Sequence, residues 1–461
     1  MTYEAIVCRL KNVRPHPNAN RLTIAQASGY QVILGLDAKE EDLGVFFGPE
    51  GRLMPSHLKE NNLYSNSDIN KDPEKKGYFG KNGKIRAQKL RGEVSEGFFQ
   101  EISAFKWAGP FPYKEGDTFS EINGHKICEK FINQATLKAI NRKNNKQKKN
   151  LWNRWKKFPI KKKIIKFFPY LWIIFMGKIQ GETKNDFSLL KEHFDTKQLR
   201  HNLNKIPVGA LCYISTKVHG TSMRGGKLLT SKKYYGWFSK IRNFFSKPEY
   251  RYLSGSRRVI LDYDNNKAAK DGFYNSDFRK IVHDKIKEIG LKKNETLYGE
   301  IVGYSDQMTP LMGTYNSDDK EIKKLYGKDI TFSYGCKPTD VNQFGNCFKV
   351  FIYRITLTNE DGYIVEYSWP QVKARCAELG LETVPEVMRL EFIGADDLLK
   401  KIQPYIDGPD PLDNSHPREG LVIRVEHEEM NTNLKIKGST FCILESIRTS
   451  DDLFEDLEDI S

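Results

Sequence analysis

The positive charge of this chain is confined to one internal stretch, which separates two regions that must fold on their own. The chain has 461 residues, with 74 Lys+Arg against 59 Asp+Glu, and a formal net charge of +15. Residues 130–181 contain 15 Lys and Arg and no acidic residue, so the other 409 residues carry equal numbers of both signs. The sequence therefore predicts a basic module joined to ordinary globular domains, and it excludes a uniformly basic nucleic-acid wrapper.

Cysteine content and hydropathy limit the cellular setting. The number of cysteines, seven, is odd, and no two of them stand at C-x-x-C spacing. This disfavours a disulfide framework or a thiolate zinc site and predicts a reducing compartment, either cytoplasm or nucleus. No secretory signal opens the sequence at Met1. The best apolar run, residues 167–177, is interrupted by Pro169 and is shorter than the ~20 residues of a membrane span.

The pattern along the chain predicts an α+β protein of several segments. Short strand-like runs at residues 5–10, 22–27 and 30–36, with a Pro/Asn-rich turn at 15–20, favour a small OB-like β-barrel. Longer strands with interspersed helices begin at about residue 190, and we expect the helices at residues 281–288, 369–379 and 395–402. The predicted division is an OB-like domain at 1–125, a basic linker or insertion at 126–189, a second domain at 190–445 and an acidic tail at 446–461.

The basic stretch, residues 130–181, allows three interpretations. Its lysines and arginines are interleaved with aromatic residues such as Trp152 and Trp155, which suits a clamp on a nucleic-acid backbone. It also fits a solvated helix followed by an apolar patch packed between domains. Its basic flanks around residues 160–178 suit, as a third alternative, peripheral contact with an anionic membrane surface.

A set of short motifs in the second domain carries the chemistry. No P-loop of the form G-x4-G-K-[ST] is present. Instead, Lys217-Val218-His219-Gly220 follows a strand-like run, so that a lysine amine can enter a cleft just before a glycine turn. Five further segments follow in order: 254–258, 296–301 with Glu300 in an apolar strand, 348–357, 418–424 and 434–438. In the last segment Lys435 and Lys437 share one strand face, which requires an anion such as a triphosphate opposite them.

This order of motifs resembles the covalent nucleotidyltransferase superfamily of ATP-dependent ligases and mRNA capping enzymes. The resemblance covers residues 190–445 and the motifs numbered I, Ia, III, IIIa, IV and V in that superfamily. It implies an ATP-grasp-like domain built from antiparallel sheets. Motif I reads K-x-H-G instead of the common K-x-D-G, and the histidine form resembles RNA ligases. The OB domain with motif VI, which DNA ligases and capping enzymes carry at the C-terminal side, has no counterpart after Lys437.

The N-terminal region sharpens this resemblance. Residues 16–22 read H-P-N-A-N-R-L and resemble a turn of tRNA-binding OB domains, and residues 89–97 resemble a later L-R-G segment of those domains. An N-terminal OB module before a K-x-H-G nucleotidyltransferase domain is similar to RNA ligase family five. Those enzymes seal 3′-OH/5′-phosphate nicks and need RNA on the 3′-OH side. The basic stretch at 130–181 has no counterpart that we can assign in that family.

The resemblance implies a three-step reaction that depends on a lysine. Lys217 attacks the α-phosphorus of ATP and forms lysyl-AMP, AMP then moves to the 5′-phosphate, and the 3′-OH finally displaces AMP. A lysine nucleophile must be neutral, although the ordinary pKa of lysine is ~10.4. Cations nearby favour the neutral form of an amine. Lys435, Lys437 and a bound Mg²⁺ or Mn²⁺ are the expected source of that field, and they also stabilise the transition state.

The remaining roles also follow from the resemblance. Glu300 is implied to bind the ribose hydroxyls or a metal, and Glu419 to hold a divalent cation. Tyr353 stands where the family stacks an aromatic ring on adenine, but Arg354 replaces the usual aspartate, so Phe351 is a rival.

Three more positions complete the implied nucleotide site. Arg257 matches the position that contacts the AMP phosphate or the 3′-OH strand, with Arg258 as the alternative. His219 is implied to contact phosphates unless it is structural. Gly220 permits the turn after Lys217.

We therefore predict an ATP-dependent RNA ligase that acts on nicked duplexes with RNA at the 3′-OH side. The alternatives are a DNA ligase, a capping-type guanylyltransferase, or a non-catalytic nucleic-acid-binding protein derived from a ligase. Nick substrates that differ only in a single 3′-terminal ribose distinguish an RNA ligase from a DNA ligase. Labelling with GTP instead of ATP distinguishes it from a capping-type guanylyltransferase.

Overall fold

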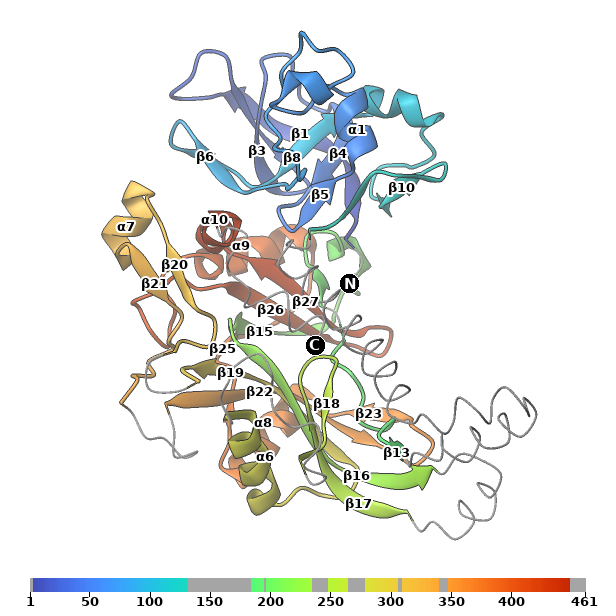
Figure 1. The fold of residues 1–461 in the computed structure, drawn as a ribbon, viewed down its shortest axis with the longest axis vertical. Coiled ribbons are helices and arrows are strands. Elements are labelled where there is room, and N and C mark those ends of the chain that lie inside the picture. The colour runs from blue at the N-terminus through green and yellow to red at the C-terminus, as the bar shows by residue number, and fades with distance from the viewer. Residues whose placement is uncertain are drawn as a thin grey trace, which may run out of the picture.

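The computed structural model describes residues 3–131, 184–194, 196–233, 248–263, 278–305, 309–339 and 347–447. Predictions for most of the basic stretch, including Trp152, Trp155 and residues 160–178, lie outside the described residues, as does the acidic tail beyond residue 447. We use "N-terminal unit" for residues 3–131 and "catalytic unit" for the described residues from 184 to 447. Figure 1 shows the N-terminal unit at one end of the molecule, above helices α7, α9 and α10 of the catalytic unit.

The N-terminal unit is built on a six-stranded antiparallel sheet in the order β3-β2-β1-β4-β8, with β9 paired to β1. The strands are β1 (Ala5–Pro15), β2 (Thr23–Ala27), β3 (Tyr30–Leu34), β4 (Leu43–Phe47), β8 (Phe98–Glu101) and β9 (Thr118–Phe119). Strand β1 changes register between Lys11 and Arg14, so it bends and pairs with different partners along its length. Apolar side chains pack on both faces of this sheet, and its strands β2 and β4 are buried for most of their length.

Smaller elements close the N-terminal unit. They are β5 (Gly51–Leu53), α1 (Pro55–Glu60), the 3₁₀ turns η1 (Ser67–Ile69) and η2 (Ile102–Ala108), β6 (Gln88–Leu90), β7 (Glu93–Ser95), β10 (Glu121–Ile122), β11 (His125–Lys126) and β12 (Cys128–Lys130). Strand β12 pairs with β5, so the N-terminal unit holds its own chain up to Lys130.

The first sheet of the catalytic unit has eight strands in the order β18-β17-β16-β19-β22-β23, with β13 on β16 and β24 on β22. Its strands are β13 (Lys184–Asp186), β16 (Thr221–Lys233), β17 (Glu249–Gly255), β18 (Ile260–Leu261), β19 (Glu295–Gly303), β22 (Phe348–Thr358), β23 (Ile364–Glu366) and β24 (Glu382–Thr383). Helices α6 (Phe278–Ile289) and α8 (Trp369–Leu379) pack on β16, β17 and β22. Helix α8 begins at a capping box of Ser368 and Gln371 and ends at Gly380 in the left-handed conformation.

The second sheet has five strands in the order β14-β27-β26-β15-β25. They are β14 (Lys197–Gln198), β15 (Leu211–Lys217), β25 (Glu386–Glu391), β26 (Gly420–Glu426) and β27 (Asn431–Lys437). Helix α9 (Ala395–Ile406) packs on β26, and α10 (Ser439–Ile447) follows β27 directly. A short turn η3 (Leu203–Lys205) and an arm of β20 (Thr314–Asn316), α7 (Lys320–Tyr326) and β21 (Asp329–Thr331) complete the unit.

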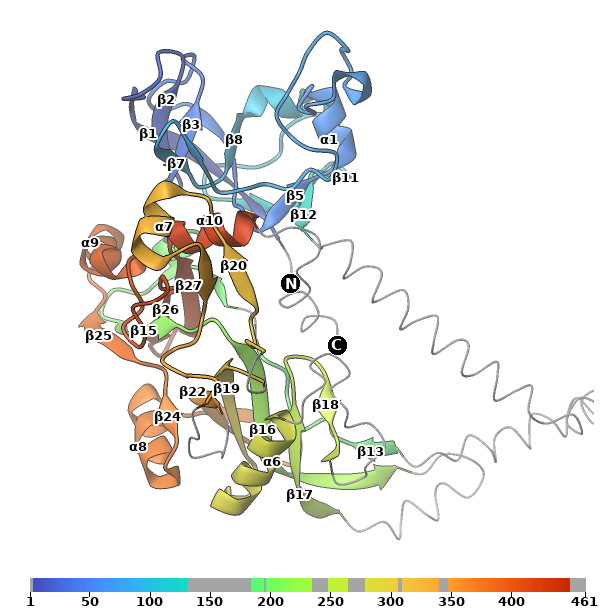
Figure 2. The same cartoon turned by 60° about the vertical axis from the view of Figure 1, so that its left-hand side comes forward.

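The N-terminal unit contacts the catalytic unit at several points. Lys89 pairs with Asp319 at 3.0 Å and with Glu321 at 2.6 Å, both on the arm that carries α7. The guanidinium of Arg200 lies 4.6 Å from the ring centre of Tyr30. Figure 2 shows α7 and α10 directly beneath the N-terminal unit. This contact brings N-terminal residues next to the end of β27, where the site described below begins.

The observed architecture confirms the coarse prediction of a mixed α and β protein with mostly antiparallel sheets. The three predicted helices are α6, α8 and α9, although α6 begins three residues earlier and α9 continues to Ile406. Pro404 stands inside the last turn of α9, which a helix can tolerate near its end. Within the part of the chain that the structure describes, no helix is long and apolar enough to cross a membrane.

Candidate active site

The strand register of the second sheet places the motif lysines together. Lys217 is the last residue of β15 and lies opposite Gly420 on β26, and Gly420 lies opposite Lys437 on β27. Residues in register on neighbouring strands project to the same face, so this row presents two lysine side chains side by side. Lys435 stands two residues before Lys437 on the same face, while Leu434 and Ile436 are buried in the core. The predicted alternation of this strand is confirmed.

Lys217 is held by a buried carboxylate. Its Nζ lies 2.6 Å from Oε1 of Glu419, a side chain that is 2 % exposed. The second oxygen of Glu419 lies 3.7 Å from Nδ1 of His219 and has no hydrogen-bond partner among the described residues. In this arrangement Lys217 and Glu419 form an ion pair.

His219 lies in an aromatic cage. Its Nε2 is 2.7 Å from the hydroxyl of Tyr315, and its ring packs edge-on against Phe332 and Phe441. Its backbone N–H donates to the hydroxyl of Tyr334. His219 is buried and lies behind Glu419, away from the cavity described below. His219 therefore lies next to Glu419 and outside the lining of the cavity, and its implied contact with phosphates stays a prediction.

Lys435 and Lys437 have carboxylate partners of their own. Lys437 lies 2.8 Å from Oε1 of Glu50 and 2.9 Å from Oε2 of Glu445, and Lys435 lies 3.5 Å from Glu50. Burial lowers the pKa of Lys435, an effect that Lys437 reinforces and Glu50 opposes. Burial alone raises the pKa of Glu50, but the charges of the two lysines outweigh it and hold this pKa well below its ordinary value. The cationic field expected from the sequence is thus balanced by carboxylates in this state.

A cavity extends from Lys217 between the two sheets. Its walls come from β15, β26 and β27 on one side and from β16, β19 and β22 on the other. Its lining combines aromatic, cationic and hydroxyl side chains with a single carboxylate among the described residues, Glu300. The aromatic lining residues are His193, Phe194, Tyr213, Tyr353 and Trp369. A flat aromatic wall that leads to a lysine amine suits a nucleobase with phosphates directed at the lysine.

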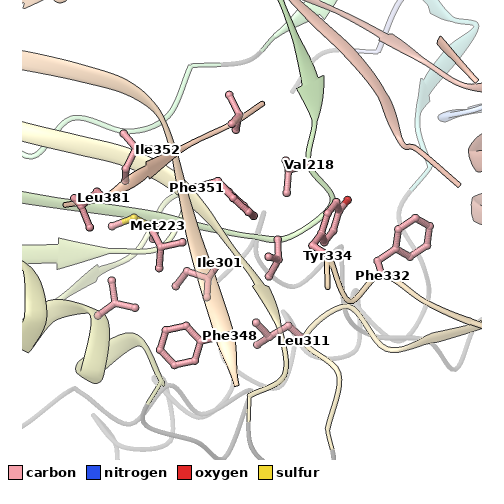
Figure 3. Close-up of a cluster of buried hydrophobic side chains, with 14 of the residues drawn as sticks. Val218, Met223, Ile301, Leu311, Phe332, Tyr334, Phe348, Phe351, Ile352 and Leu381 are labelled. Carbon is pink, nitrogen blue, oxygen red and sulfur yellow. The ribbon is translucent and has the colours of Figure 1, made fainter. Parts of the chain in front are cut away.

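A β-bulge places Tyr353 in this cavity. Tyr298 pairs with Arg354 and Gly299 with Ile352, so Tyr353 is the extra residue of β22 opposite β19. Tyr353 is half-buried and lines the cavity, whereas Phe351 is 1 % exposed and belongs to the core. Figure 3 shows Phe351 among Ile352, Met223 and Ile301. The geometry therefore favours Tyr353 over its rival as the stacking residue.

Glu300 faces the same cavity from the next strand. It stands opposite Ser222 on β16, whose hydroxyl donates to Oε1 of Glu300 at 3.1 Å. Its neighbours on β19 are buried, which matches the expectation of a lone carboxylate in an apolar strand. Arg257 also lines the cavity, while Arg258 is exposed. The structure thus separates two arginines that the sequence left as alternatives.

Two motif residues have roles that the sequence did not predict. A Cβ atom on Gly220 would lie 2.6 Å from the carbonyl oxygen of Ile301, so close approach to β19 requires this glycine. Arg354, which replaces the usual aspartate, has its guanidinium 4.4 Å and 4.6 Å from the ring centres of Phe194 and Tyr298. It also pairs with Glu366 at 3.1 Å. Gly220 therefore allows close packing on β19, and Arg354 forms part of the cavity wall.

Sequence reasoning missed several residues of the site. Nδ1 of His193 lies 2.5 Å from the hydroxyl of Tyr353, and burial holds the pKa of His193 well below its ordinary value. Glu50, from the N-terminal unit, and Glu445, eight residues after Lys437, both pair with Lys437. None of the three stands in a motif, and Glu50 lies 385 residues before Lys435 in the sequence. Only the three-dimensional contact reveals them.

The acidic residues of the site fit a divalent cation that is shared with a phosphate ligand. Among the described residues, no three His, Cys, Asp or Glu side chains gather as a complete metal site. Glu419 offers one buried oxygen without a hydrogen-bond partner, and Glu300 offers a carboxylate in the cavity. Mg²⁺ commonly binds one or two carboxylates and completes its shell with water and substrate phosphates. The donor set therefore fits that kind of cation.

Comparison with known proteins agrees with the fold. Residues 211–437 match the family model described as RNA ligase. No curated protein matches the chain significantly. Among solved structures, an RNA ligase of Naegleria gruberi with PPi has a TM-score of 0.53 at 14% identity, over 96% of this chain and 99% of the other.

Variants of the same Naegleria gruberi enzyme match similarly. One with AMP and Mn has a TM-score of 0.52 at 14% identity, over 95% of this chain and 97% of the other. Another with ATP and Mn has a TM-score of 0.51 at 14% identity, over 95% and 98% of the two chains. The shared architecture therefore extends over nearly the whole of both chains.

Lys217 stands at the end of β15 and lines the cavity between the two sheets. The segment that matches the RNA ligase family contains Lys217, Glu300, Glu419, Lys435 and Lys437. Residues 211–437 therefore form an RNA ligase domain of the nucleotidyltransferase type, and the protein is an RNA ligase.

Proposed function

We propose that this RNA ligase uses ATP and a divalent cation to seal 3′-OH/5′-phosphate nicks through a lysyl-AMP intermediate. The observation that carries the proposal is the position of Lys217, which lines the nucleotide-sized cavity and also pairs with Glu419 beside Lys437. The Naegleria gruberi RNA ligase has been solved with ATP and Mn, with AMP and Mn, and with PPi. ATP and PPi are the substrate and the leaving group of the first step that we propose here, and AMP is the group that is transferred and finally released.

Lys217 is the proposed nucleophile. Its amine attacks the α-phosphorus of ATP, a P–N bond forms, and pyrophosphate leaves with the electrons of the broken P–O bond. The 5′-phosphate at the nick then attacks the same phosphorus and takes AMP from the lysine. Finally, the 3′-OH attacks the activated 5′-phosphate and releases AMP. Before the first step Lys217 must give up its ion pair with Glu419 and lose a proton, because only the neutral amine is nucleophilic.

The cavity residues hold the nucleoside in this proposal. Tyr353 stacks on adenine, with its hydroxyl fixed by His193. Glu300, fixed by Ser222, binds the ribose hydroxyls at the same wall. Arg257 lines the route to Lys217 and binds the phosphate of AMP.

The charge cluster acts on the phosphates. Lys435 and Lys437 stabilise negative charge that develops on the α-phosphate and on the leaving pyrophosphate. Glu419 and Glu300 are the residues that would hold Mg²⁺ or Mn²⁺, which supplies neutralisation of phosphate charge when bound. His219 lies 3.7 Å from Glu419, and Gly220 lets β16 approach β19.

We further propose the finer identity suggested by the sequence. The N-terminal unit is an OB-like module at 1–125 that grips the RNA-containing duplex, as in RNA ligase family five. The catalytic domain at 190–445 has an ATP-grasp-like arrangement, and the protein works in a reducing compartment, cytoplasm or nucleus. The linker at 126–189 and the tail at 446–461 stay predictions from the sequence alone.

Nicked duplexes test the substrate directly. Two substrates are compared that differ only in the sugar at the 3′-OH end of the nick, ribose in one and deoxyribose in the other. We expect the ribose nick to be sealed at least tenfold faster, with accumulation of the adenylylated 5′-end on the deoxyribose nick. Equal sealing of both substrates would identify a DNA ligase instead.

A further inference from the structure

The N-terminal unit supplies one residue to the phosphate end of the site. Glu50 lies in the turn between β4 and β5, and its carboxylate bridges Lys437 at 2.8 Å and Lys435 at 3.5 Å. Both lysines are largely buried, with side chains 11% and 16% exposed, and the Glu50 side chain is 25% exposed. The contact is therefore an enclosed ion pair between two units of the molecule, in contrast to the surface pairs that contribute little.

The turn that presents Glu50 is held firmly. The hydroxyl of Tyr3 donates to the carbonyl of Gly48 at 2.8 Å, and the N–H of Phe131 donates to the carbonyl of Glu50 at 3.1 Å. Gly51 packs so tightly on the ring of Tyr3 that a Cβ atom there would clash with it. A carboxylate on such a backbone is pre-positioned, so little conformational entropy is lost when it meets the lysines.

Glu50 belongs to a cluster of paired lysines and carboxylates around Lys217. Three lysines, Lys217, Lys435 and Lys437, face three carboxylates, Glu50, Glu419 and Glu445. The phosphates of a nucleotide require the same ammonium groups. A polyanion and a carboxylate that share two lysines repel each other, so binding of one disfavours the contact of the other. Glu50 is the member of this described set that comes from the N-terminal unit.

We infer that Glu50 is a positioning residue that holds Lys435 and Lys437 in the unliganded enzyme and competes with nucleotide phosphates for them. The inference rests on the proposed function of these lysines as phosphate-binding groups. By thermodynamic linkage, a ligand that displaces Glu50 is bound more weakly than it would be without the competing carboxylate. The contact therefore sets the nucleotide concentration at which the site fills.

Calorimetric titration of the full-length protein with inorganic pyrophosphate tests the inference. Glu50→Gln keeps the size of the side chain and removes its charge, and we expect pyrophosphate to bind about five- to tenfold more tightly. For ATP, KM should fall by a similar factor with little change in kcat. Unchanged or weaker pyrophosphate binding by Glu50→Gln overturns the inference.

A matched variant separates competition from simple loosening of the two units. Arg200→Gln removes the stacking on Tyr30 at the same interface, away from the lysines, and we expect pyrophosphate binding to stay at the wild-type value. An equal gain in affinity in Arg200→Gln overturns the inference, because loosening alone would then explain the effect. If Glu50→Gln does not fold, Glu50→Asp replaces it, with a carboxylate one methylene shorter. Glu50→Asp must also bind pyrophosphate more tightly than wild type, and unchanged affinity overturns the inference.

A failure of the inference about Glu50 can be distinguished from a failure of the proposed function. Lysyl-AMP formation is measured in the wild type in parallel with pyrophosphate binding. A wild type that forms no lysyl-AMP contradicts the proposed function. The pyrophosphate affinities of the wild type and the two interface variants still decide the role of Glu50, because that measurement needs no turnover.

Discussion

The two ends of the active site are built in different ways. The cavity is assembled from neighbouring strands of the catalytic unit, and its aromatic wall is aimed by one bulge at Tyr353. The charge cluster instead gathers Lys217, Lys437, Glu419 and Glu445 from the catalytic unit and Glu50 from the N-terminal unit. In the proposed function the cavity selects the nucleoside by shape, while the cluster selects phosphates by charge and connects that selection to the N-terminal unit.

This difference predicts separate effects on two ligands. Pyrophosphate has phosphates without a nucleoside, and ATP has both. Changes in the cluster should affect both ligands, whereas changes at the base end of the cavity should affect ATP alone. The predictions below use this contrast.

The largest effect is expected from Lys437→Ala. Loss of a buried cation beside the reacting phosphate should lower the rate of lysyl-AMP formation by about 10²–10³-fold and weaken pyrophosphate binding as well. Single-turnover labelling and calorimetry measure the two quantities. Lys437→Arg, which keeps the charge, is the control, and both variants need a melting curve because Ala leaves Glu50 and Glu445 close together. Normal pyrophosphate binding by a folded Lys437→Ala would remove this lysine from the phosphate end.

A smaller and more selective effect is expected from Tyr353→Ala. Stacking of a base on an aromatic ring contributes ~1–3 kcal/mol, so ATP should bind roughly tenfold more weakly. Pyrophosphate should bind as in the wild type, because the ring lies in the cavity and not in the cluster. Tyr353→Phe keeps the ring and loses only the contact with His193, so its loss should be much smaller. Equal weakening of both ligands by Tyr353→Ala would break the division between the two ends.

Two adjacent arginines provide a matched pair. Arg257 lines the cavity, and Arg258 is exposed beside it. We expect Arg257→Ala to lower kcat/KM for lysyl-AMP formation by a factor of about ten, as for the loss of one hydrogen bond to a charged group. Arg258→Ala should stay within twofold of the wild type. The reverse order of effects would move the phosphate contact to Arg258.

The smallest effect concerns stability as a function of pH. Burial holds the pKa of His193 well below its ordinary 6.5. As the pH falls below 6.5, His193 therefore takes up a proton in the unfolded chain but stays neutral in the folded protein. The stability that His193 contributes is present above pH 6.5 and is lost as the pH falls below it. The pKa of Glu50 lies well below its ordinary 4.5, so its contribution is present above pH 4.5 and is lost below.

A denaturation series across pH separates the two contributions. Acidification from pH 7 to 5 should reduce the unfolding free energy of the wild type more than that of His193→Gln. The behaviour of Glu50→Gln should differ from that of the wild type mainly below pH 4.5. A His193→Gln variant that loses as much stability as the wild type between pH 7 and 5 would contradict a neutral, buried His193.

Much of the site could be predicted from the sequence, because each motif and each strand alternation is recognised from residues that are close together in the chain. Lys217 at a strand end, Glu300 in an apolar strand and the shared face of Lys435 and Lys437 all depend on neighbours within a few residues. Strand alternation alone could not separate Tyr353 from Phe351, because a bulge opposite Gly299 breaks the alternation. Such an irregularity depends on the partner strand and leaves no mark in the sequence of β22.

Long-range contacts account for the rest. His219 reads as a phosphate ligand by its place in the motif, but Tyr315, Phe332 and Phe441, all far along the chain, enclose it. Glu50 reads as an ordinary turn residue, because its partners are on β27. For the same reason, the sequence predicted the cations around Lys217 but not the carboxylate of Glu50 that pairs with two of them. Counter-charges from distant segments become visible only when the two units are placed together.

The central claim is that Lys217 forms a covalent bond to AMP. The wild type and Lys217→Ala are incubated with α-labelled ATP and Mg²⁺, and the denatured proteins are examined for covalently bound label. We predict a labelled wild type whose label is released by acid and withstands alkali, as a phosphoramidate does, and an unlabelled Lys217→Ala. Wild-type protein without covalent AMP, or a Lys217→Ala protein labelled equally, would contradict the account.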